Sequence, residues 1–177
     1  LGMGWTLVIG IGALALTHTL LSEGRWQGAS LRQIVDAEMR GFVGEGRISL
    51  TGEDVSLKAA AAQDLTMALH ELATNAAKYG ALSVQDGMVA IHWERNAAWL
   101  RLRWTETGGP PLAAPHHKGF GSRVVEVTVA SQLGGSIHWH WQPLGLICDS
   151  VLPEEGVLAP ETPPASGQNL PAPFLKL

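Results

Sequence analysis

Residues 69–83, with the sequence LHELATNAAKYGALS, constrain the fold and the chemistry of this chain more than any other segment. On a helix, Glu71, Asn75 and Lys78 fall within roughly 60° of one another, whereas the leucines gather on a different face. Asn is a poor helix former because its side chain competes for backbone hydrogen bonds, so its place in mid-helix needs a reason. A carboxylate, an amide and an ammonium in one line suit a metal–phosphate ligand. The simpler alternative is a solvated polar face.

The composition indicates one folded domain with appendages and excludes some classes of function. Of the 177 residues 46% are hydrophobic and 16% charged, and the formal net charge is −4, which excludes the basic surface of a nucleic-acid binder. The single cysteine, Cys148, rules out an intramolecular disulfide and fits a reducing compartment, so we expect a cytoplasmic location. The apolar segment 6–21 is shorter than the roughly 20 residues that a membrane span needs, so no span is expected there.

Helix signals dominate the first half of the chain. Residues 13–21 are predicted to be helical, and a second helix begins at Ser30, a natural N-cap with Gln33 as its capping-box partner, and stops at Gly41. The long helix is predicted over residues 59–79, with Gly80 as a left-handed C-terminal cap. Between these helices, two short strands over residues 47–50 and 55–57 are predicted to flank a hairpin turn.

The second half reads mainly as strands. Alternating apolar and polar residues predict four of them, and a helix ended by two glycines is predicted over residues 121–133. The four strands are expected at residues 88–93, 99–105, 136–141 and 146–152. The whole pattern predicts an α+β fold, a two-layer α/β sandwich with a mixed, mostly antiparallel sheet, preceded by a partial helical hairpin. We expect three parts: residues 1–41, residues 42–153, and a proline-rich, disordered tail over 154–177.

Two glycine-rich boxes flank a polar segment after the second of these strands. In the first box, WTETGGP, Glu106 is an acceptor for an amino group such as that of adenine, and Gly108 and Gly109 allow a close backbone approach. The second box runs from Gly119 to Ser122 and opens a helix, where free N–H groups suit phosphate oxygens. The segment 111–118 between the boxes is polar and is expected to close over a ligand as a lid.

The helix and the two boxes resemble the Bergerat-fold ATPase and kinase superfamily, and most closely the HWE-type sensor histidine kinases. The segment HELATNAAKYGALS corresponds to the N box, WTETGGP to the G1 box and GFGSR to the G2 box, in the family's order. The histidine, tryptophan and glutamate that name the group match His70, Trp104 and Glu106. The similarity covers residues 13 to 153, so the expected parts become a partial dimerisation region (1–41) and an ATP-binding catalytic domain (42–153).

The resemblance implies a role for each matching residue. Asn75 would be the Mg²⁺ ligand, Glu71 would polarise the attacking group, and Lys78 would contact phosphate. Glu106 would bind the adenine amino group, where most of the superfamily uses Asp. His70 is open between a chemical role and a role in bracing the site. The remaining residues would line the nucleotide or hold its phosphates, and they are Gly108, Gly109, Gly119, Gly121 and Ser122. The implied cofactors are ATP and Mg²⁺, and the implied activity is that of a protein-histidine kinase.

The chain departs from the family in its phosphate acceptor. Histidine kinases of this type carry an acceptor histidine on a helical hairpin, but His18 is the only histidine before His70 and does not lie in such a motif. We therefore expect the acceptor to come from a hairpin elsewhere or from another chain, with a homodimer possible. A response regulator is the expected downstream partner.

Other readings of the same residues remain open. Three strand histidines, His92, His138 and His140, suggest a zinc site, although no cysteine pair accompanies them. The seven tryptophans are better explained as core residues than as a stacking platform for single-stranded nucleic acid. Two other functions compete with the kinase: an anti-sigma-type kinase of the same superfamily, and a nucleotide-binding interaction module that transfers no phosphate.

Overall fold

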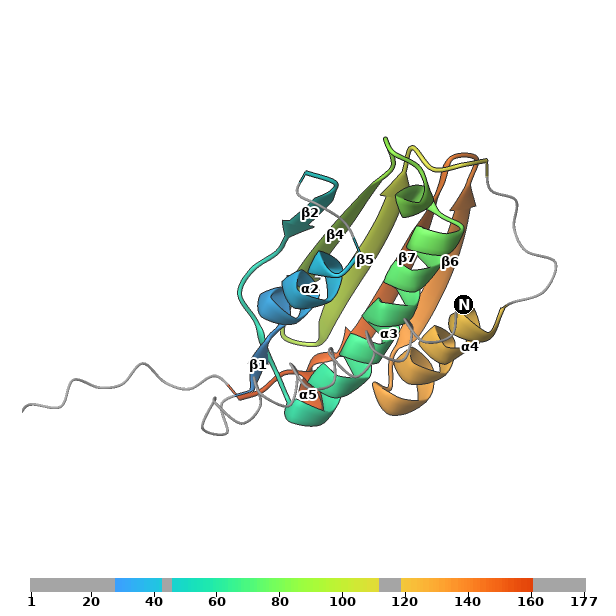
Figure 1. The fold of residues 1–177 in the computed structure, drawn as a ribbon. Helices are drawn as coiled ribbons and strands as arrows, with labels where there is room; N and C mark the ends of the chain where they lie inside the picture. The colour runs from blue at the N-terminus through green and yellow to red at the C-terminus, as the bar shows by residue number, and fades with distance from the viewer. Residues whose placement is uncertain (1–27, 43–45, 112–118, 161–177) are drawn as a thin grey trace, which may run out of the picture.

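The computed structural model describes residues 28–42, 46–111 and 119–160 (Figure 1). The helix expected at 13–21, all but the first residue of the lid expected at 111–118, and the tail beyond residue 160 lie outside these ranges. Among the helices that are described, none is both long and apolar enough to span a membrane.

A five-stranded mixed sheet forms one layer of the fold, in the order β2-β4-β5-β7-β6. Its edge strand β2 pairs in parallel with β4, and the other neighbours pair antiparallel. The strands are β2 (Ile48–Thr51), β4 (Met88–Arg95), β5 (Trp99–Thr107), β6 (Ser136–Gln142) and β7 (Gly145–Pro153). This arrangement confirms the predicted α+β fold with a mixed, mostly antiparallel sheet.

Three helices cover one face of the sheet, with α3 crossing between α2 and α4 (Figure 1). The helix α2 begins at its predicted N-cap, because the Ser30 hydroxyl accepts a hydrogen bond from the Gln33 amide at 3.4 Å. The predicted helix after the second box is also present, although its last turns are π-helical. The helical segments are α2 (Leu31–Arg40), α3 (Ala59–Lys78), η1 (Ala81–Ser83), α4 (Phe120–Val127), the π-helical η2 (Thr128–Gln132) and α5 (Glu154–Val157).

One hydrophobic core lies between the helices and the sheet, and it crosses both expected domain boundaries. Leu31 and Val35 of α2 are fully buried in the same core as α3 and the sheet, so α2 packs as part of this folded unit. Val157 and Leu158 are buried as well, and the Lys58 amide donates to the Val157 carbonyl at 2.9 Å. The expected tail therefore does not begin at residue 154, because these two apolar side chains seal the end of the core.

The hairpin predicted around residues 52–54 is wrong. The strand β2 pairs with β4, whereas β3 (Ser56–Leu57) pairs with β1 (Ala29–Ser30) in a separate two-stranded sheet. The turn between β2 and β3 packs on Trp93 instead: the indole N–H donates to the Glu53 carbonyl at 2.7 Å, and Gly52 lies against the ring with φ 155°. The short strands follow these long-range contacts, which local alternation does not reveal.

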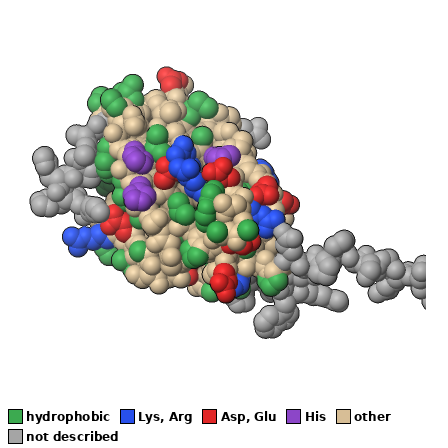
Figure 2. Space-filling model, turned by 180° about the vertical axis from the view of Figure 1, so that it is seen from behind, with side chains coloured by type: hydrophobic (Ala, Val, Ile, Leu, Met, Phe, Trp, Pro, Cys, Tyr) green, Lys and Arg blue, Asp and Glu red, His purple; other side chains and the backbone are tan. Residues whose placement is uncertain are grey.

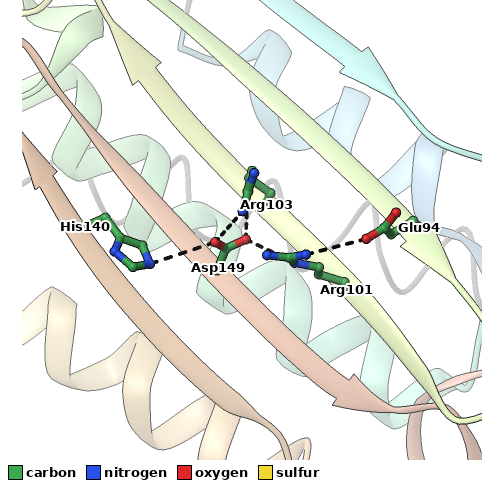
Figure 3. A network of polar contacts seen from close by, with 5 residues as sticks. All are labelled: Glu94, Arg101, Arg103, His140 and Asp149. Carbon is green, nitrogen blue, oxygen red and sulfur yellow. Dashed lines mark hydrogen bonds and ion pairs between the residues drawn. The ribbon is translucent and has the colours of Figure 1, made fainter.

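The opposite face of the sheet carries a network of charged side chains (Figures 2 and 3). Arg103 donates to both carboxylate oxygens of Asp149 at 2.8 and 2.7 Å, and Arg101 lies 3.3 Å from the same group. These arginines are therefore paired within the sheet, as expected of a solvent-facing strand surface rather than a nucleic-acid site. Within the described residues, no three His, Cys, Asp or Glu side chains are placed to hold a metal, so the structure offers no support there for a zinc site.

Candidate functional site

Two polar side chains of α3 face the start of α4. A Cβ atom on Gly121 would lie 2.8 Å from the Oε2 atom of Glu71 and 3.3 Å from both the Oδ1 and Nδ2 atoms of Asn75. Glu71 and Asn75 are one helical turn apart and half-buried, so both reach the same backbone position of the neighbouring helix. The absence of a side chain at Gly121 is what permits this close approach between the N box and the G2 box.

The start of α4 presents backbone donors beside these two residues. Gly119 is the N-cap, makes no side-chain capping bond, and accepts the first helical hydrogen bond from the Arg123 amide at 3.2 Å. Among the described residues, a Cβ atom on Gly119 would meet no heavy atom within 4 Å. By their position, the amides of Phe120, Gly121 and Ser122 have no acceptor within the helix, and such donors favour an anion.

Lys78 lies three residues beyond Asn75 on the predicted stripe, at the exposed end of α3. Its charge also complements the helix dipole there, because cations are favoured at a helix C-terminus. Lys78 is exposed to solvent, whereas Glu71 and Asn75 are half-buried.

Glu106 forms a second part of the site, at the end of β5. Its side chain is buried, with only 4% of the residue exposed. Its Oε2 atom accepts a hydrogen bond from the Ala81 amide at 2.8 Å, and its Oε1 atom accepts one from the Trp104 indole at 3.0 Å. Burial raises the pKa of the Glu106 carboxyl, and these two hydrogen bonds partly oppose that rise. The carboxylate is therefore fixed in orientation but still has unused acceptor capacity.

Gly80 does not have the predicted role of capping the long helix. Its φ of −104° and ψ of −153° are not left-handed, so the predicted C-terminal cap is wrong. A Cβ atom there would lie 2.0 Å from the Oε2 atom of Glu106. Glycine is required at this position by the carboxylate beside it, and not by the end of the helix.

The glycines of the G1 box approach protein backbone. A Cβ atom on Gly109 would lie 3.0 Å from the Cα atom of Ala81, and the Gly109 amide donates to the Leu144 carbonyl at 3.0 Å. Gly108 has the left-handed φ of 68°, a conformation that glycine adopts readily. These contacts join the G1 box to the loop after α3 and to the turn between β6 and β7. The sequence predicts a close approach to a ligand, whereas the contacts in the structure are with protein backbone and build the rim of the site.

His70 lies beside Glu71 but points to another partner. Its Nδ1 atom is 2.6 Å from the Oε1 atom of Glu38 on α2, whose side chain is only 4% exposed. The ring of Phe42 packs edge-on against the imidazole at 5.6 Å. The hydrogen bond to Glu38 raises the pKa of His70, while burial opposes it. The geometry supports the bracing role for His70, because the ring ties α3 to α2.

Comparison with known proteins now identifies the family. A sequence model described as HWE histidine kinase matches residues 8–54, a segment that precedes the N box. The chain is 36% identical over 146 residues to a blue-light-activated histidine kinase of Rhizobium johnstonii, and this match covers 81% of the chain. A blue-light-activated histidine kinase of Brucella ovis is 32% identical over 165 residues, or 90% of the chain. The chain belongs to the HWE histidine kinase family.

The chain spans less than half the length of these two relatives, covering 42% of the first and 33% of the second. Among solved structures, the histidine kinase domain of the Erythrobacter litoralis blue-light-activated kinase matches with a TM-score of 0.67 at 20% identity, over 85% of this chain and 76% of that chain. The catalytic domain of histidine kinase ThkA matches with a TM-score of 0.53 at 17% identity, over 70% of this chain and 93% of that one. The fold is that of histidine kinase catalytic domains.

A further match concerns an assembly. Histidine kinase ThkA in complex with the response regulator protein TrrA matches with a TM-score of 0.54 at 16% identity, over 88% of this chain and 52% of that chain. The likeness at this identity concerns the fold of the kinase.

In this HWE family member, hydrogen bonds hold two of the three naming residues, His70 and Glu106. Glu38 holds His70, and the Ala81 amide holds Glu106 together with Trp104. Arg47, just before β2, donates hydrogen bonds to the carbonyls of Ala81, Val84 and Gly87. The sequence did not identify Glu38 and Arg47 as residues that support the site through these hydrogen bonds. For Glu38 alone the sequence held a signal. This residue continues the apolar stripe of α2, and a carboxylate buried at such a position needs a hydrogen-bonding partner.

Proposed function

We propose that this chain is the ATP-binding catalytic domain of a two-component sensor histidine kinase, and that it transfers the γ-phosphoryl group of ATP to a histidine supplied by another segment or chain. One observation carries the proposal: Glu71 and Asn75 of α3 converge on Gly121 at the start of α4. Acceptor side chains and the first amides of a helix at one place suit a metal-bound phosphate chain.

The two parts of the site fit an elongated nucleotide. Gly80, which packs on Glu106, follows Glu71 by nine residues, a separation of about 13 Å along a helix. A ligand that reaches both parts therefore needs a base at one end and phosphates at the other. Glu106 accepts a hydrogen bond from the adenine amino group, and the glycines of the G1 box shape the rim against which the base lies.

The residues around the phosphate end of the site have separate proposed roles in binding Mg²⁺ and the phosphates. The oxygens of Asn75 and Glu71 are of the type that Mg²⁺ prefers, so these two residues fit the ion, with Asn75 proposed as its ligand. When bound, Mg²⁺ neutralises the charge that develops on the phosphates. The amides at Gly121 and Ser122 hold phosphate oxygens, and Lys78 adds a positive charge. In this proposal Glu71 also polarises the imidazole that attacks the phosphorus.

We further propose that a response regulator receives the phosphoryl group afterwards, as supported by the ThkA complex with TrrA. Because ATP is the proposed phosphate donor, we infer that the chain works in the cytoplasm. These two statements extend the proposed activity and share its test.

The decisive experiment supplies the full chain with labelled ATP, Mg²⁺ and a separate helical hairpin that carries a phosphoacceptor histidine. Label on that histidine is the expected result, and a hairpin with His→Gln at the acceptor is the matched control. Nucleotide binding without any transfer would instead make the chain a binding module. Asn75→Ala should remove Mg²⁺-dependent ATP binding, whereas Gln63→Ala, which removes an exposed amide from the same helix, should leave it unchanged.

A further inference from the structure

Arg47 lies outside the three boxes and binds backbone carbonyls with its side chain. Its Nε atom donates to the Gly87 carbonyl at 2.9 Å, and its Nη2 atom donates to the carbonyls of Ala81, at 3.2 Å, and Val84. One guanidinium therefore gathers three carbonyls of the loop that joins α3 to β4. A guanidinium has five donors in a rigid plane, so it fixes such a loop in a way that a single ammonium cannot.

The gathered loop donates a hydrogen bond to the proposed adenine-binding carboxylate through Ala81. Ala81 is fully buried, its carbonyl accepts from Arg47, and its amide donates to Glu106 at 2.8 Å. The peptide groups on the two sides of Ala81 thus connect Arg47 to Glu106. Close packing leaves Ala81 no room to shift, since a Cβ atom on Gly87 would lie 1.7 Å from its carbonyl oxygen.

The backbone of Arg47 is anchored in the same part of the sheet. Its carbonyl accepts from the Val89 amide at 3.0 Å, and Val89 is the register partner of Glu106 across β4 and β5. Arg47 and Glu106 are therefore held by one segment of β4 as well as by the loop. A movement of the Arg47 side chain would release the loop on one side of Glu106 only, leaving Trp104 as the remaining donor.

We propose that Arg47 is a positioning residue for adenine recognition, which holds Ala81 so that its amide aims the Glu106 carboxylate at the base. The inference rests on the proposed function and deepens it. Arg47 itself touches no nucleotide in this scheme. Its loss should therefore weaken the part of the affinity that depends on the base and leave the part that depends on phosphate.

The test compares ATP, GTP and inorganic tripolyphosphate on the full chain with Mg²⁺. Guanine carries a carbonyl where adenine carries its amino group, so preference for ATP over GTP reports the aim of Glu106. Arg47→Gln should lower ATP affinity by about three- to tenfold, the range for a weakened hydrogen bond to a charged group, and should reduce the preference over GTP. Tripolyphosphate affinity should not change. Arg47→Lys, which retains the charge and most of the stem, should give a smaller loss and serves if the Gln variant does not fold.

The matched control replaces another arginine whose side chain donates a hydrogen bond to a backbone carbonyl. Arg32 donates to the Gly52 carbonyl at 2.7 Å and stacks over Trp93 at 5.0 Å, on contacts that do not include the Ala81 loop. Arg32→Gln should leave the preference for ATP over GTP intact. In the background of Glu106→Ala, the Arg47→Gln change should have no further effect on ATP binding, because the group that it positions is gone.

Two results would overturn the inference while leaving the proposed function standing. One is an equal loss of ATP and tripolyphosphate affinity in Arg47→Gln. The other is an undiminished effect of that change in the Glu106→Ala background. If the unaltered chain shows no preference for ATP over tripolyphosphate, the proposed function fails at the adenine contact, and this inference fails with it.

Discussion

A methyl group on Gly80 would lie 2.0 Å from the Oε2 atom of Glu106 and 3.0 Å from the Cα atom of Ala76. The first overlap involves the group proposed to bind adenine, and the second involves backbone that cannot move away. The longer glutamate at the G1 box, where most of the superfamily carries aspartate, is thus accommodated by a glycine at the end of the N-box helix.

Gly80→Ala should therefore destabilise the fold by about 1–3 kcal/mol, the usual cost of overpacking, and should weaken ATP binding by displacing Glu106. The double variant Gly80→Ala with Glu106→Asp should recover part of the stability, since the shorter carboxylate withdraws from the new methyl group. Urea unfolding monitored by tryptophan fluorescence gives the free energies. Full stability and affinity in the single variant would show that Gly80 does not make room for Glu106.

Gly121→Ala tests the other close contact of the site. The new Cβ atom would lie 2.8 Å from the Oε2 atom of Glu71, at the far end of a flexible side chain that is able to shift. Stability should change by less than about 1 kcal/mol, because alanine is the better helix former. Mg²⁺-dependent ATP binding should fall, because Glu71 and Asn75 are pushed out of line.

The matched comparison for this variant is Gly119→Ala, whose new Cβ atom would meet no heavy atom of the described residues within 4 Å. Isothermal titration with Mg–ATP should show a clear loss for Gly121→Ala and a smaller one for Gly119→Ala. An equal loss in both variants would mean that glycine flexibility, and not the contact with Glu71, is what matters at the G2 box.

The sequence predicts the parts of this site that depend on periodicity. The stripe of Glu71, Asn75 and Lys78 follows from a helical repeat, and the position of Glu106 follows from a strand that ends in two glycines. Both patterns are local, so they can be recognised in the sequence without knowledge of the fold. The order of the boxes then supplies the family, which local patterns alone do not.

The supporting contacts were not predictable in the same way. Arg47 reaches Ala81 and Gly87 across 34 and 40 residues of chain, and Glu38 reaches His70 across 32. Such pairs arise only once α2, α3 and the sheet are packed. Gly80 illustrates the same limit: a glycine after a helix favours a left-handed cap, but here the reason for the glycine lies on another strand.

The pair of His70 and Glu38 predicts a pH-dependent contribution to stability. The pKa of His70 is raised above its ordinary value of 6.5, chiefly by the hydrogen bond to Glu38. A raised native pKa means that the native state binds the proton more tightly, so the stabilisation is fully present below pH 6.5 and is lost as the pH rises through the native pKa. His70→Gln should therefore cost roughly 1–3 kcal/mol in mild acid and less in alkaline solution.

Glu38→Gln is the reciprocal change, because it removes the carboxylate that raises the pKa of His70. The His70 titration, followed by NMR of the imidazole protons, should then move to lower pH. If the pKa of His70 is unchanged in Glu38→Gln, Glu38 does not control it, and the contact between the two residues makes no electrostatic contribution to stability.

Asp149 on the open sheet face predicts the opposite pH dependence (Figure 3). Hydrogen bonds from Arg103 lower the pKa of this carboxyl below its ordinary value of 3.8. Its stabilisation is therefore present above pH 3.8 and is lost as the pH falls through the lowered native pKa. Asp149→Asn should cost about 1–2 kcal/mol at pH 7, a discounted value because both arginines are partly exposed to solvent.

A surface pair on α2 provides the control for this last change. Asp36 pairs with Arg40 one turn away, but both side chains are well exposed, so Asp36→Asn should alter stability by no more than about 0.5 kcal/mol. Urea unfolding of the three proteins between pH 7 and about 2 gives the comparison. The deficit of Asp149→Asn should be constant near neutrality and shrink in acid. A deficit that persists unchanged at the lowest pH would mean that packing of the side chain, and not its charge, stabilises the open face of the sheet.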